Sequence, residues 1–250
     1  MMIFHQTIHF AGLWILLPFL IVMPVQQQND DSLFSQDICH FPCWQNITPG
    51  QSTITDVMEV VVALDLEHST FFKQSTYDLT EFSQPYLASE RHTIWWWNDR
   101  PATQNVITLD DAIVRSIQIR ETTNFTLEDI LTAYGEPDES RLRYDYSVEV
   151  NWGTVFLSVF YYHLGLKVDF VLYRSRDVPE TVKLEISSDA IGIGYTLYPA
   201  TSARLNFSAN MFGLSVDTIE RQFTETYYRP GWHGLGYPLR LEYGQLYVRR

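Results

Sequence analysis

The sequence predicts an α+β fold of two tandem units, each made of short helices and an antiparallel β-meander, behind an N-terminal hydrophobic segment. Three observations indicate this fold: a short helix with clear start and stop signals, an earlier segment of the same pattern, and a high aromatic content. Aromatic residues make up 15% of the 250 residues, and they favour antiparallel sheet, where large side chains pair across strands. The 46% hydrophobic content is sufficient for a substantial core.

The clearest helix is predicted within residues 125–137. Thr126 can cap its first turn, and Asp129 stands three residues later as the capping-box partner. The residues that follow repeat apolar side chains at helical spacing. Gly135 and Pro137 provide the stop signal. The segment therefore carries the local signals of one short helix.

An earlier segment, 53–58, repeats the cap, the acid and the apolar positions of 126–131. Its helix is expected to run from Thr53 to about Asp65. We therefore predict two versions of one unit within the chain. The expected parts are a signal peptide or membrane anchor at 1–25, a linker at 26–38, a first helix-plus-meander unit at 39–120, a second such unit at 121–200, and a C-terminal extension at 201–250.

Most of the remaining chain shows the alternation, or the β-branched and aromatic enrichment, that is typical of strands. A second short helix is expected within 66–77, and 215–223 has a further helix-like start. Two of the strands are expected to form a hairpin about Asp110-Asp111, where the acid pair serves as turn chemistry. Further turns are predicted at Asn151-Trp152-Gly153 and His163-Leu164-Gly165. The predicted strands are 93–98, 105–109, 112–119, 147–152, 154–162, 166–173, 182–186, 191–198 and 239–248.

The N-terminal hydrophobic segment indicates export. Residues 10–25 carry no charge, and this run is as long as a signal-peptide core and just short of the ~20 residues that span a bilayer. No Lys or Arg precedes the run and no small-x-small cleavage site follows it, so a cleaved signal and an uncleaved anchor are both open. A buried helix of the fold is the third alternative. We expect an exported protein of the cell envelope, membrane-anchored if the segment is retained and secreted otherwise.

Charge and motif content argue against several function classes. With 17 basic and 30 acidic residues the formal net charge is -13, which opposes binding to nucleic acid. The sequence lacks a nucleophile elbow, a zinc-protease motif, a Walker loop and a complete dinucleotide fingerprint. The acid pair Asp138-Glu139, like the one in the hairpin, is assigned to solubility rather than to acid/base chemistry. We therefore expect no catalytic residue, no cofactor and no metal site.

Two groups of residues are candidates for a structural or binding role. Cys39 and Cys43 are the only cysteines, and they form either a small-loop disulfide in an oxidising compartment or two packed thiols. Three consecutive tryptophans place indoles on both faces of a predicted strand, and the simplest interpretation puts the outer two in the core while another segment covers Trp96. The alternative is that they form, with the C-terminal loop, an interaction surface or a ligand pocket. The candidate surface comprises Trp95, Trp96, Trp97, Trp232 and His233.

Two motifs in the predicted units carry a family resemblance. They are Pro49-Gly50 with Thr53-x-x-Asp56-Val57, and Thr126-x-x-Asp129-Ile130-Leu131 with Tyr134-Gly135-Glu136-Pro137. This pattern resembles the helical half of the BamE (SmpA/OmlA) family, in which it precedes three antiparallel strands. Two such units in tandem resemble the β-lactamase-inhibitor-protein architecture.

The whole chain also resembles a group of uncharacterised exported or membrane-anchored bacterial proteins that carry the pattern Cys-Trp-x-x-Ile-x-Pro-Gly, found here at 43–50. The resemblance implies an envelope protein that binds other proteins and has no cofactor and no catalytic residues. The expected function is a non-enzymatic extracytoplasmic protein-interaction or assembly module, with a protein partner in the envelope. The alternative is a small-ligand-binding protein, or an unrecognised hydrolase, whose aromatic residues line a pocket.

Overall fold

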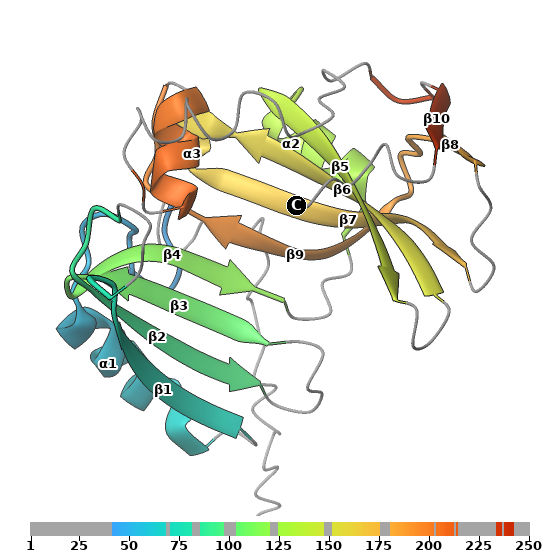
Figure 1. Cartoon of the computed structure of the whole chain (residues 1–250). Coiled ribbons are helices and arrows are strands. Elements are labelled where there is room, and N and C mark those ends of the chain that lie inside the picture. Colours follow the sequence, from blue (N-terminus) through green and yellow to red (C-terminus); the bar gives the residue numbers. More distant parts are fainter. Residues whose placement is uncertain are drawn as a thin grey trace, which may run out of the picture. The chain divides into compact units, whose positions relative to one another are not determined.

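The computed structural model describes residues 42–68, 71–81, 86–97, 104–120, 125–147, 152–175, 181–202, 204–212, 214, 234–236 and 238–242. These residues belong to one compact unit. The predicted N-terminal segment and linker, at 1–25 and 26–38, lie outside the described residues, and so does the predicted helix start at 215–223. The described fold is α+β, an eight-stranded antiparallel sheet with a few short helices (Figure 1).

The described elements are short and follow one another closely along the chain. In order they are α1 (Ile54–Ala63), η1 (Leu66–His68), β1 (Phe71–Asp78), β2 (Glu90–Trp97), β3 (Asn105–Asp110), β4 (Ile113–Ile119), α2 (Leu127–Tyr134), β5 (Glu139–Ser147), β6 (Trp152–Tyr161), η2 (Tyr162–Leu164), β7 (Leu166–Ser175), β8 (Thr181–Glu185), β9 (Ile191–Leu197), α3 (Arg204–Phe212) and β10 (Pro238–Glu242).

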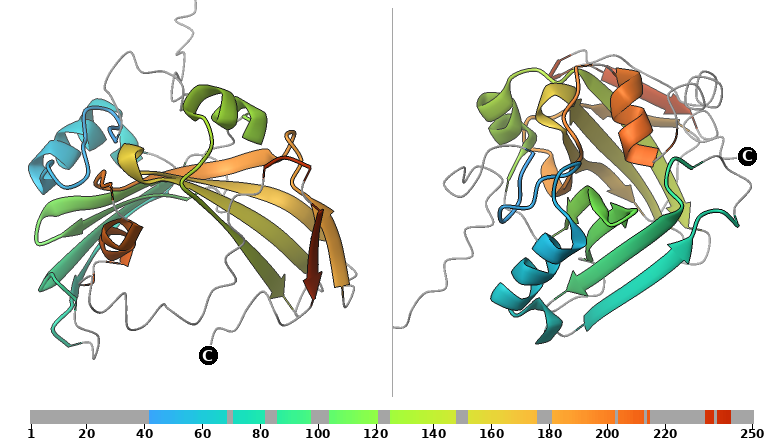
Figure 2. Two further views of the ribbon diagram at one scale, coloured as in Figure 1. Left: turned by 90° about the horizontal axis from the view of Figure 1, so that it is seen from above. Right: turned by 90° about the vertical axis from the view of Figure 1, so that its left-hand side faces the viewer.

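The large sheet has the strand order β1-β2-β3-β4-β9-β7-β6-β5, and neighbouring strands are antiparallel. β8 and β10 form a separate antiparallel pair. We call α1 with β1–β4 the first half, and α2 with β5, β6, β7 and β9 the second half. Figure 2 shows α1 and α2 on one side of the sheet and α3 on the other. We call these sides the helix face and the polar face.

The helices predicted from Thr53 and within 125–137 are confirmed, and each begins with the predicted capping box. The backbone N–H of Thr53 donates to the Asp56 carboxylate at 2.6 Å, and the Thr53 hydroxyl accepts from the Asp56 N–H. Thr126 and Asp129 form the same pair of contacts, with a backbone donor distance of 2.7 Å. At the other end of α2, Gly135 is the C-cap with φ of 77°. The two capping boxes satisfy backbone N–H donors that a helix leaves unpaired in its first turn.

Each helix N-terminus is also attached to the last strand of its own half. In the first half Thr53 forms an antiparallel bridge with Ile113, the first residue of β4. In the second half Thr126 forms the same bridge with Ile191, the first residue of β9. Backbone hydrogen bonds of 2.8–2.9 Å flank both bridges. The two helices are thus fixed to the sheet in the same way.

A β-bulge recurs at the same place in both halves. Between β3 and β4 the register shifts so that Arg115 is the extra residue. Between β7 and β9 it shifts so that Ile193 is the extra residue. In each strand the bulge comes two residues after the bridge to the helix cap. Because a bulge is a specific local feature of a strand pair, its recurrence relates the two halves independently of their side chains.

The halves join where β4 pairs with β9, and this pairing is symmetric. Its centre is the pair Gln118–Thr196, and each of these residues lies three positions beyond the bulge of its strand. On one side of this centre Ile117 pairs with Leu197, and on the other side Ile119 pairs with Tyr195. In both pairs, one residue lies two positions beyond its bulge and the other lies four positions beyond its bulge. The two halves are therefore related by an approximate twofold axis through the Gln118–Thr196 pair.

The main core lies between the helix face and the helices α1 and α2. Val57 and Val61 of α1, and Leu127 and Ile130 of α2, have no exposed surface. Burying one such side chain contributes about 1.5–3 kcal/mol. The strands supply aliphatic side chains that are also buried, among them Ile94, Ile107, Ile117, Leu157, Val159, Val168 and Leu197.

The turns predicted before β4 and before β7 are both present, although the first is centred on Asp111-Ala112, one residue later than the predicted Asp110-Asp111. In the β3–β4 hairpin, Asp111 and Ala112 have φ of 49° and 68°, the positive values that a type I′ turn requires. The turn before β7 ends at Gly165, which has φ of 61°. A Cβ at Gly165 would lie 2.1 Å from the carbonyl oxygen of Tyr198, so a side chain would force this close approach apart.

The helix predicted within 66–77 is wrong for most of its length. Only the single turn η1 is helical, and 71–78 form the edge strand β1. β1 pairs with β2 residue by residue along its whole length. Long-range strand pairing here outweighs the local apolar spacing, as is common for residues of intermediate propensity.

The strand predicted at 147–152 is also misplaced, and α3 is not predicted from the sequence. β5 begins at Glu139, directly after α2, and Trp152-Gly153 of the predicted turn begin β6. Arg141 and Arg143 make 139–147 too polar for a buried strand by sequence alone. In the sheet, the Arg141 side chain lies on the polar face and pairs with Glu139, which is compatible with a strand.

Replacing Gly192 by alanine is expected to destabilise the protein by about 1–3 kcal/mol, because an added Cβ overpacks the core. That Cβ would lie 2.0 Å from the ring of Phe125, which packs edge-on against Phe170 with ring centres 5.9 Å apart. Urea denaturation of Gly192→Ala measures the change in the free energy of unfolding. Adding Phe125→Ala removes the ring, so the two costs are expected to be less than additive. Additive costs would show that the ring is not the obstacle.

Candidate functional site

The three tryptophans at the end of β2 lie on both faces of the sheet, because successive residues of a strand alternate. Trp96 points to the helix face, where it is 2% exposed and its ring centre lies 5.5 Å from that of Trp44. Trp95 and Trp97 lie on the polar face and are half-buried. The interpretation that puts the outer tryptophans in the core is therefore wrong, and Trp96 is a core residue rather than part of a surface.

The other predicted site residues are described only in part. Trp232 and His233 lie outside the described residues, so their place in an interaction surface stays a prediction. Cys43 is disulfide-bonded. Cys39 lies outside the described residues, and the pairing of these two cysteines stays a prediction.

Trp95 and Phe160 occupy matching positions on the polar face of the two halves. Trp95 follows Thr93 by two residues, and Thr93 pairs with Thr108, where the β3–β4 register shifts. Phe160 follows Ser158 by two residues, and Ser158 pairs with Asp169, where the β7–β9 register shifts. A cation lies near each ring: the Lys73 ammonium is 5.4 Å from the centre of the Trp95 ring, and the Arg141 guanidinium is 4.6 Å from that of Phe160. Such cation–π contacts are favourable, most strongly when the cation is desolvated.

The two matching rings differ in how they are covered. Phe160 is 1% exposed, because Phe207 of α3 packs edge-on against it with ring centres 5.9 Å apart. Tyr162 and Tyr198 also contact Phe207 and complete a small second core. Trp95 remains half-buried. The polar face is thus closed by α3 over Phe160 and partly open around Trp95.

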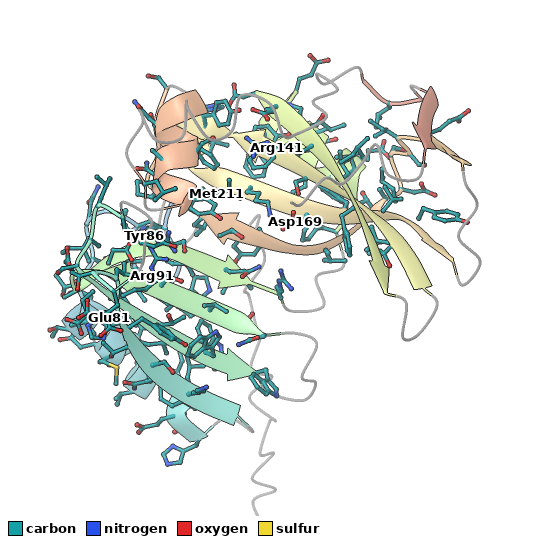
Figure 3. All side chains as sticks on the ribbon, viewed as in Figure 1. Glu81, Tyr86, Arg91, Arg141, Asp169 and Met211 are labelled. Carbon is teal, nitrogen blue, oxygen red and sulfur yellow. The ribbon has the colours of Figure 1, made fainter. Side chains whose placement is uncertain are left out.

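A charge cluster lies on the polar face of the first half, at the end of β3. Arg91, shown beside Tyr86 in Figure 3, donates to Asp110 from Nε at 2.7 Å and from Nη2 at 3.1 Å. Arg115, the bulge residue, lies 3.3 Å from the same carboxylate and donates from Nη1 to the carbonyl oxygen of Met211 at 3.2 Å. Burial lowers the pKa of Arg115, and the Asp110 carboxylate opposes that effect. One carboxylate therefore serves two guanidinium groups.

The second half carries its own charge pairs on the polar face. Lys167 donates from Nζ to the Asp169 carboxylate at 2.8 Å, and the Ser158 hydroxyl donates to the same carboxylate. Burial alone would raise the pKa of Asp169, but Lys167 and Ser158 outweigh it and hold that pKa below its usual value. Arg141 donates from Nε to Glu139 at 2.6 Å. These charges are neutralised by partners within the sheet.

The shifted carboxylates and tyrosines of the described residues have pKa values that move away from neutrality. Hydrogen bonds from Ser89 and Glu90 hold the pKa of Asp111 below its usual range. Burial raises the pKa of Tyr134 and of Tyr198 to about 12. A general acid or base works best with a pKa near the operating pH. These groups are therefore suited to structure rather than to proton transfer.

The predicted roles of the acid pairs hold only in part. Asp111 does organise the β3–β4 turn, because its carboxylate accepts from the backbone N–H groups of Ser89 and Glu90, each at 3.0 Å. Asp110 instead binds the guanidinium groups described above. Glu139 is 9% exposed, and its carboxylate accepts hydrogen bonds from the Tyr162 hydroxyl and from the Arg141 guanidinium. The assignment to turn chemistry and solubility is therefore wrong for Asp110 and Glu139.

Arg115 is the residue of the charge cluster that sequence reasoning missed. Its strand is apolar at most positions, and Val114-Arg115-Ser116 interrupts the expected alternation. An interrupted alternation can mark a bulge, so this was the available signal. The sequence alone does not reveal that the guanidinium meets Asp110.

Two cavities adjoin these elements. One of about 280 Å³ lies at the end of the polar face, beside Asp110 and Arg115, with walls from β4, α3 and residues 87–88. The other, of about 480 Å³, lies beside α1 and is lined largely by polar side chains, including Asp56 and Glu59. Neither cavity is lined by a tryptophan.

No protein-family model, no curated protein and no solved structure matches the chain. Among the described residues, no group of three or more His, Cys, Asp and Glu side chains is arranged to hold a metal ion. In the same part of the chain, no helix combines the length and the apolar character needed to cross a membrane.

Replacing Lys167 by methionine is expected to leave the Asp169 carboxylate buried without its ion-pair partner, with only the Ser158 hydroxyl and the Arg120 charge still favouring its ionised form. The expected cost at neutral pH is about 2 kcal/mol, less than the ~3–5 kcal/mol for a fully buried pair, because both side chains keep some contact with solvent. In the native protein the lowered pKa of Asp169 stabilises the fold at neutral pH, and this contribution is lost as the pH falls through the folded-state pKa.

Without Lys167, burial is expected to raise the folded-state pKa of Asp169 above its unfolded value. The deficit of the variant should then shrink as the pH is lowered from neutral to about 4. Denaturant unfolding of Lys167→Met across this range measures the deficit, and Lys167→Arg, which keeps the charge, is the control. A deficit that does not change with pH would contradict the assigned ion pair.

Proposed function

We propose that the chain is a non-enzymatic, extracytoplasmic protein-interaction or assembly module of the cell envelope, and that the polar face of its first half binds the partner. The observation that carries the proposal is the unequal cover of two matching rings. α3 closes the polar face over Phe160, whereas Trp95 keeps contact with solvent. A large aromatic ring left partly open where its counterpart is sealed is a candidate anchor for a partner.

The side chains around Trp95 suit a protein partner. Lys73 and Trp97 lie on the same face of the sheet, and Tyr77, further along β1, is 42% exposed. Aromatic side chains are enriched in protein interfaces, and Trp and Tyr are enriched among the residues that dominate binding energy. The charges that follow on this face, Arg91 and Asp110, are already paired. Paired charges of this kind suit electrostatic complementarity with a protein partner better than they suit a catalytic role.

We also propose that the two halves are tandem copies of one helix-plus-meander unit. Four features support this proposal: the capping box, the bridge from the cap to the last strand, the bulge in that strand, and the approximate twofold relation at the junction. The resemblance of the two helical segments to the BamE family points in the same direction. A module of this kind binds other proteins and needs no cofactor.

The proposed location is outside the cytoplasm. The uncharged run at 10–25 supports export, either as a retained membrane anchor or as a cleaved signal. The disulfide at Cys43 favours an oxidising compartment. The formal net charge of -13 argues against nucleic acid as the partner, which leaves an envelope protein as the proposed partner.

Site-specific crosslinking tests this function. A photoreactive amino acid replaces Tyr77 in the tagged full-length protein, expressed in its native cells, and replaces Val62 of α1 in the matched control. Both positions are exposed, at 42% and 61%, but α1 lies on the other side of the sheet. The expected result is a reproducible, stoichiometric protein adduct from position 77 and none from position 62. Trp95→Ala is expected to reduce the adduct at least about tenfold, as the loss of an anchor residue does.

Lys73→Glu serves as a second variant, because Lys73 is exposed and its replacement is expected to leave the fold intact. It should also weaken the adduct from position 77. Equal adducts from both positions, or an adduct that neither substitution weakens, would place the binding surface elsewhere. No adduct from either position would count against protein binding altogether.

A further inference from the structure

The cavity at the end of the polar face has a lining that recognises a particular chemistry. We propose that this cavity, between β4, α3 and residues 87–88, binds a carboxylate group carried on a short aliphatic body. A small aliphatic acid and the C-terminal residue of a peptide both have this chemistry. The residues that decide it are Leu87, Asp110, Asp111, Ile113 and Arg115.

The cavity is large enough for such a ligand. Its volume is about 280 Å³, and an engineered apolar cavity of ~150 Å³ holds a benzene molecule. A branched aliphatic chain with a carboxylate therefore fits. Binding sites for small ligands typically combine apolar walls with a few placed polar groups, and this cavity has both.

Among the described residues, the side chains that form ion pairs beside the cavity are two cations and one anion. Arg91 and Arg115 share the single carboxylate of Asp110. Tyr198, which lies close enough to affect Arg115, is neutral because burial raises its pKa to about 12. The Arg115 side chain is 15% exposed, and its buried Nε lies 3.3 Å from the Asp110 carboxylate without the alignment of a hydrogen bond to it or to any other described residue. A buried cation with incomplete pairing is unfavourable, and an anion in the cavity relieves it.

Asp111 also lines the cavity, but it does not cancel this charge. Its side chain is exposed, and its carboxylate accepts hydrogen bonds from Ser89 and Glu90. Water screens an exposed charge far more than a buried one. The ligand carboxylate is therefore drawn to the buried side, at Arg115, and its aliphatic body faces the opening.

Two exposed aliphatic side chains converge on the same cavity. Leu87 is 71% exposed and Ile113 is 38% exposed, and both line the cavity. A single exposed aliphatic residue needs no explanation. Two that meet beside a buried cation form the apolar part of a site for an amphipathic ligand.

The second half lacks this cation and its carboxylate at the matching positions. Ile193 is the bulge residue of β9, as Arg115 is of β4. Val171 pairs with Ile191 at the start of β9, as Asp110 pairs with Ile113 at the start of β4. The bulge therefore does not need a charged residue. The charge cluster is a property of the first half and not of the framework that both halves share.

The test compares two ligands of the same shape, 4-methylpentanoate and its uncharged amide, on purified full-length protein. Isothermal titration calorimetry measures affinity, and the methyl NMR signals of Leu87 and Ile113 report the location. The expected result is saturable binding of the acid, with shifts at both methyl positions, and at least about tenfold weaker binding of the amide, because a charge-assisted hydrogen bond is lost. Equal affinity for the two ligands would overturn the proposal.

Matched variants test the two parts of the site. Leu87→Glu places a carboxylate that competes for Arg115, whereas Leu87→Gln removes the same aliphatic group without a charge. The Glu variant is expected to bind the acid at least about fivefold more weakly than the Gln variant, and the difference should fall at high salt. Arg115→Met should also weaken binding, whereas Arg141→Met, a substitution in the other half, should not. Unchanged binding in both Leu87→Glu and Arg115→Met would overturn the proposal, as would the absence of saturable binding.

A third comparison identifies the source of the carboxylate. Tighter binding of a peptide that ends in leucine, lost when its C-terminus is amidated, supports the site and assigns it to a peptide end. Weaker or equal binding of the peptide, with the small acid still bound, supports the site and assigns it to a free acid. Trp95→Ala should leave both affinities unchanged, so failure of the carboxylate site and failure of the proposed interaction surface are distinguishable.

Discussion

The hydrogen-bonded pairing of β4 with β9 is the contact on which the large sheet depends. It involves three residue pairs centred on Gln118–Thr196, yet it joins two four-stranded halves into one sheet. Without it, both strands would present unpaired backbone groups at an edge, which is costly when buried and prone to pairing with other chains when exposed. Ile117 and Leu197, which are fully buried and pair with each other, continue the aliphatic core across this junction.

Local signals in the sequence are sufficient for α1, α2 and most strands, but not for α3 or for the faces of the sheet. The capping residues Thr53 and Thr126 act within their own turn, so the helices they begin are predictable. Whether Trp96 lies in the core depends on the register of β2 against its neighbours, which no local pattern contains. β5 is hidden because its charged side chains are paired by contacts that the sequence pattern does not show, such as the ion pair of Arg141 with Glu139. Arg115 is hidden for the same reason, since its role depends on a carboxylate at the end of another strand.

The proposed sites arise where two matching halves differ. The shared framework places an aromatic ring and a nearby cation on the polar face of each half, and α3 then seals Phe160 while Trp95 stays partly open. The shared bulge likewise carries Ile193 in one half and Arg115 in the other. The shared architecture thus stabilises both halves, and the side chains that differ between the halves form the proposed binding sites. The sequence could not show this, because the positions match only through the bulge and the strand register.

The bridge from each helix cap to the last strand of its half also sets an order of events during synthesis. Thr53 bridges to Ile113 and Thr126 bridges to Ile191, which are 60 and 65 residues further along the chain. At a translation rate of roughly 5–20 residues per second, each helix waits several seconds for the strand that holds it. Throughout that interval its apolar stripe, including Val57 and Val61 in α1, has no completed sheet to cover it. The newly made chain therefore exposes an apolar helix stripe before its strand is available, first in one half and then in the other.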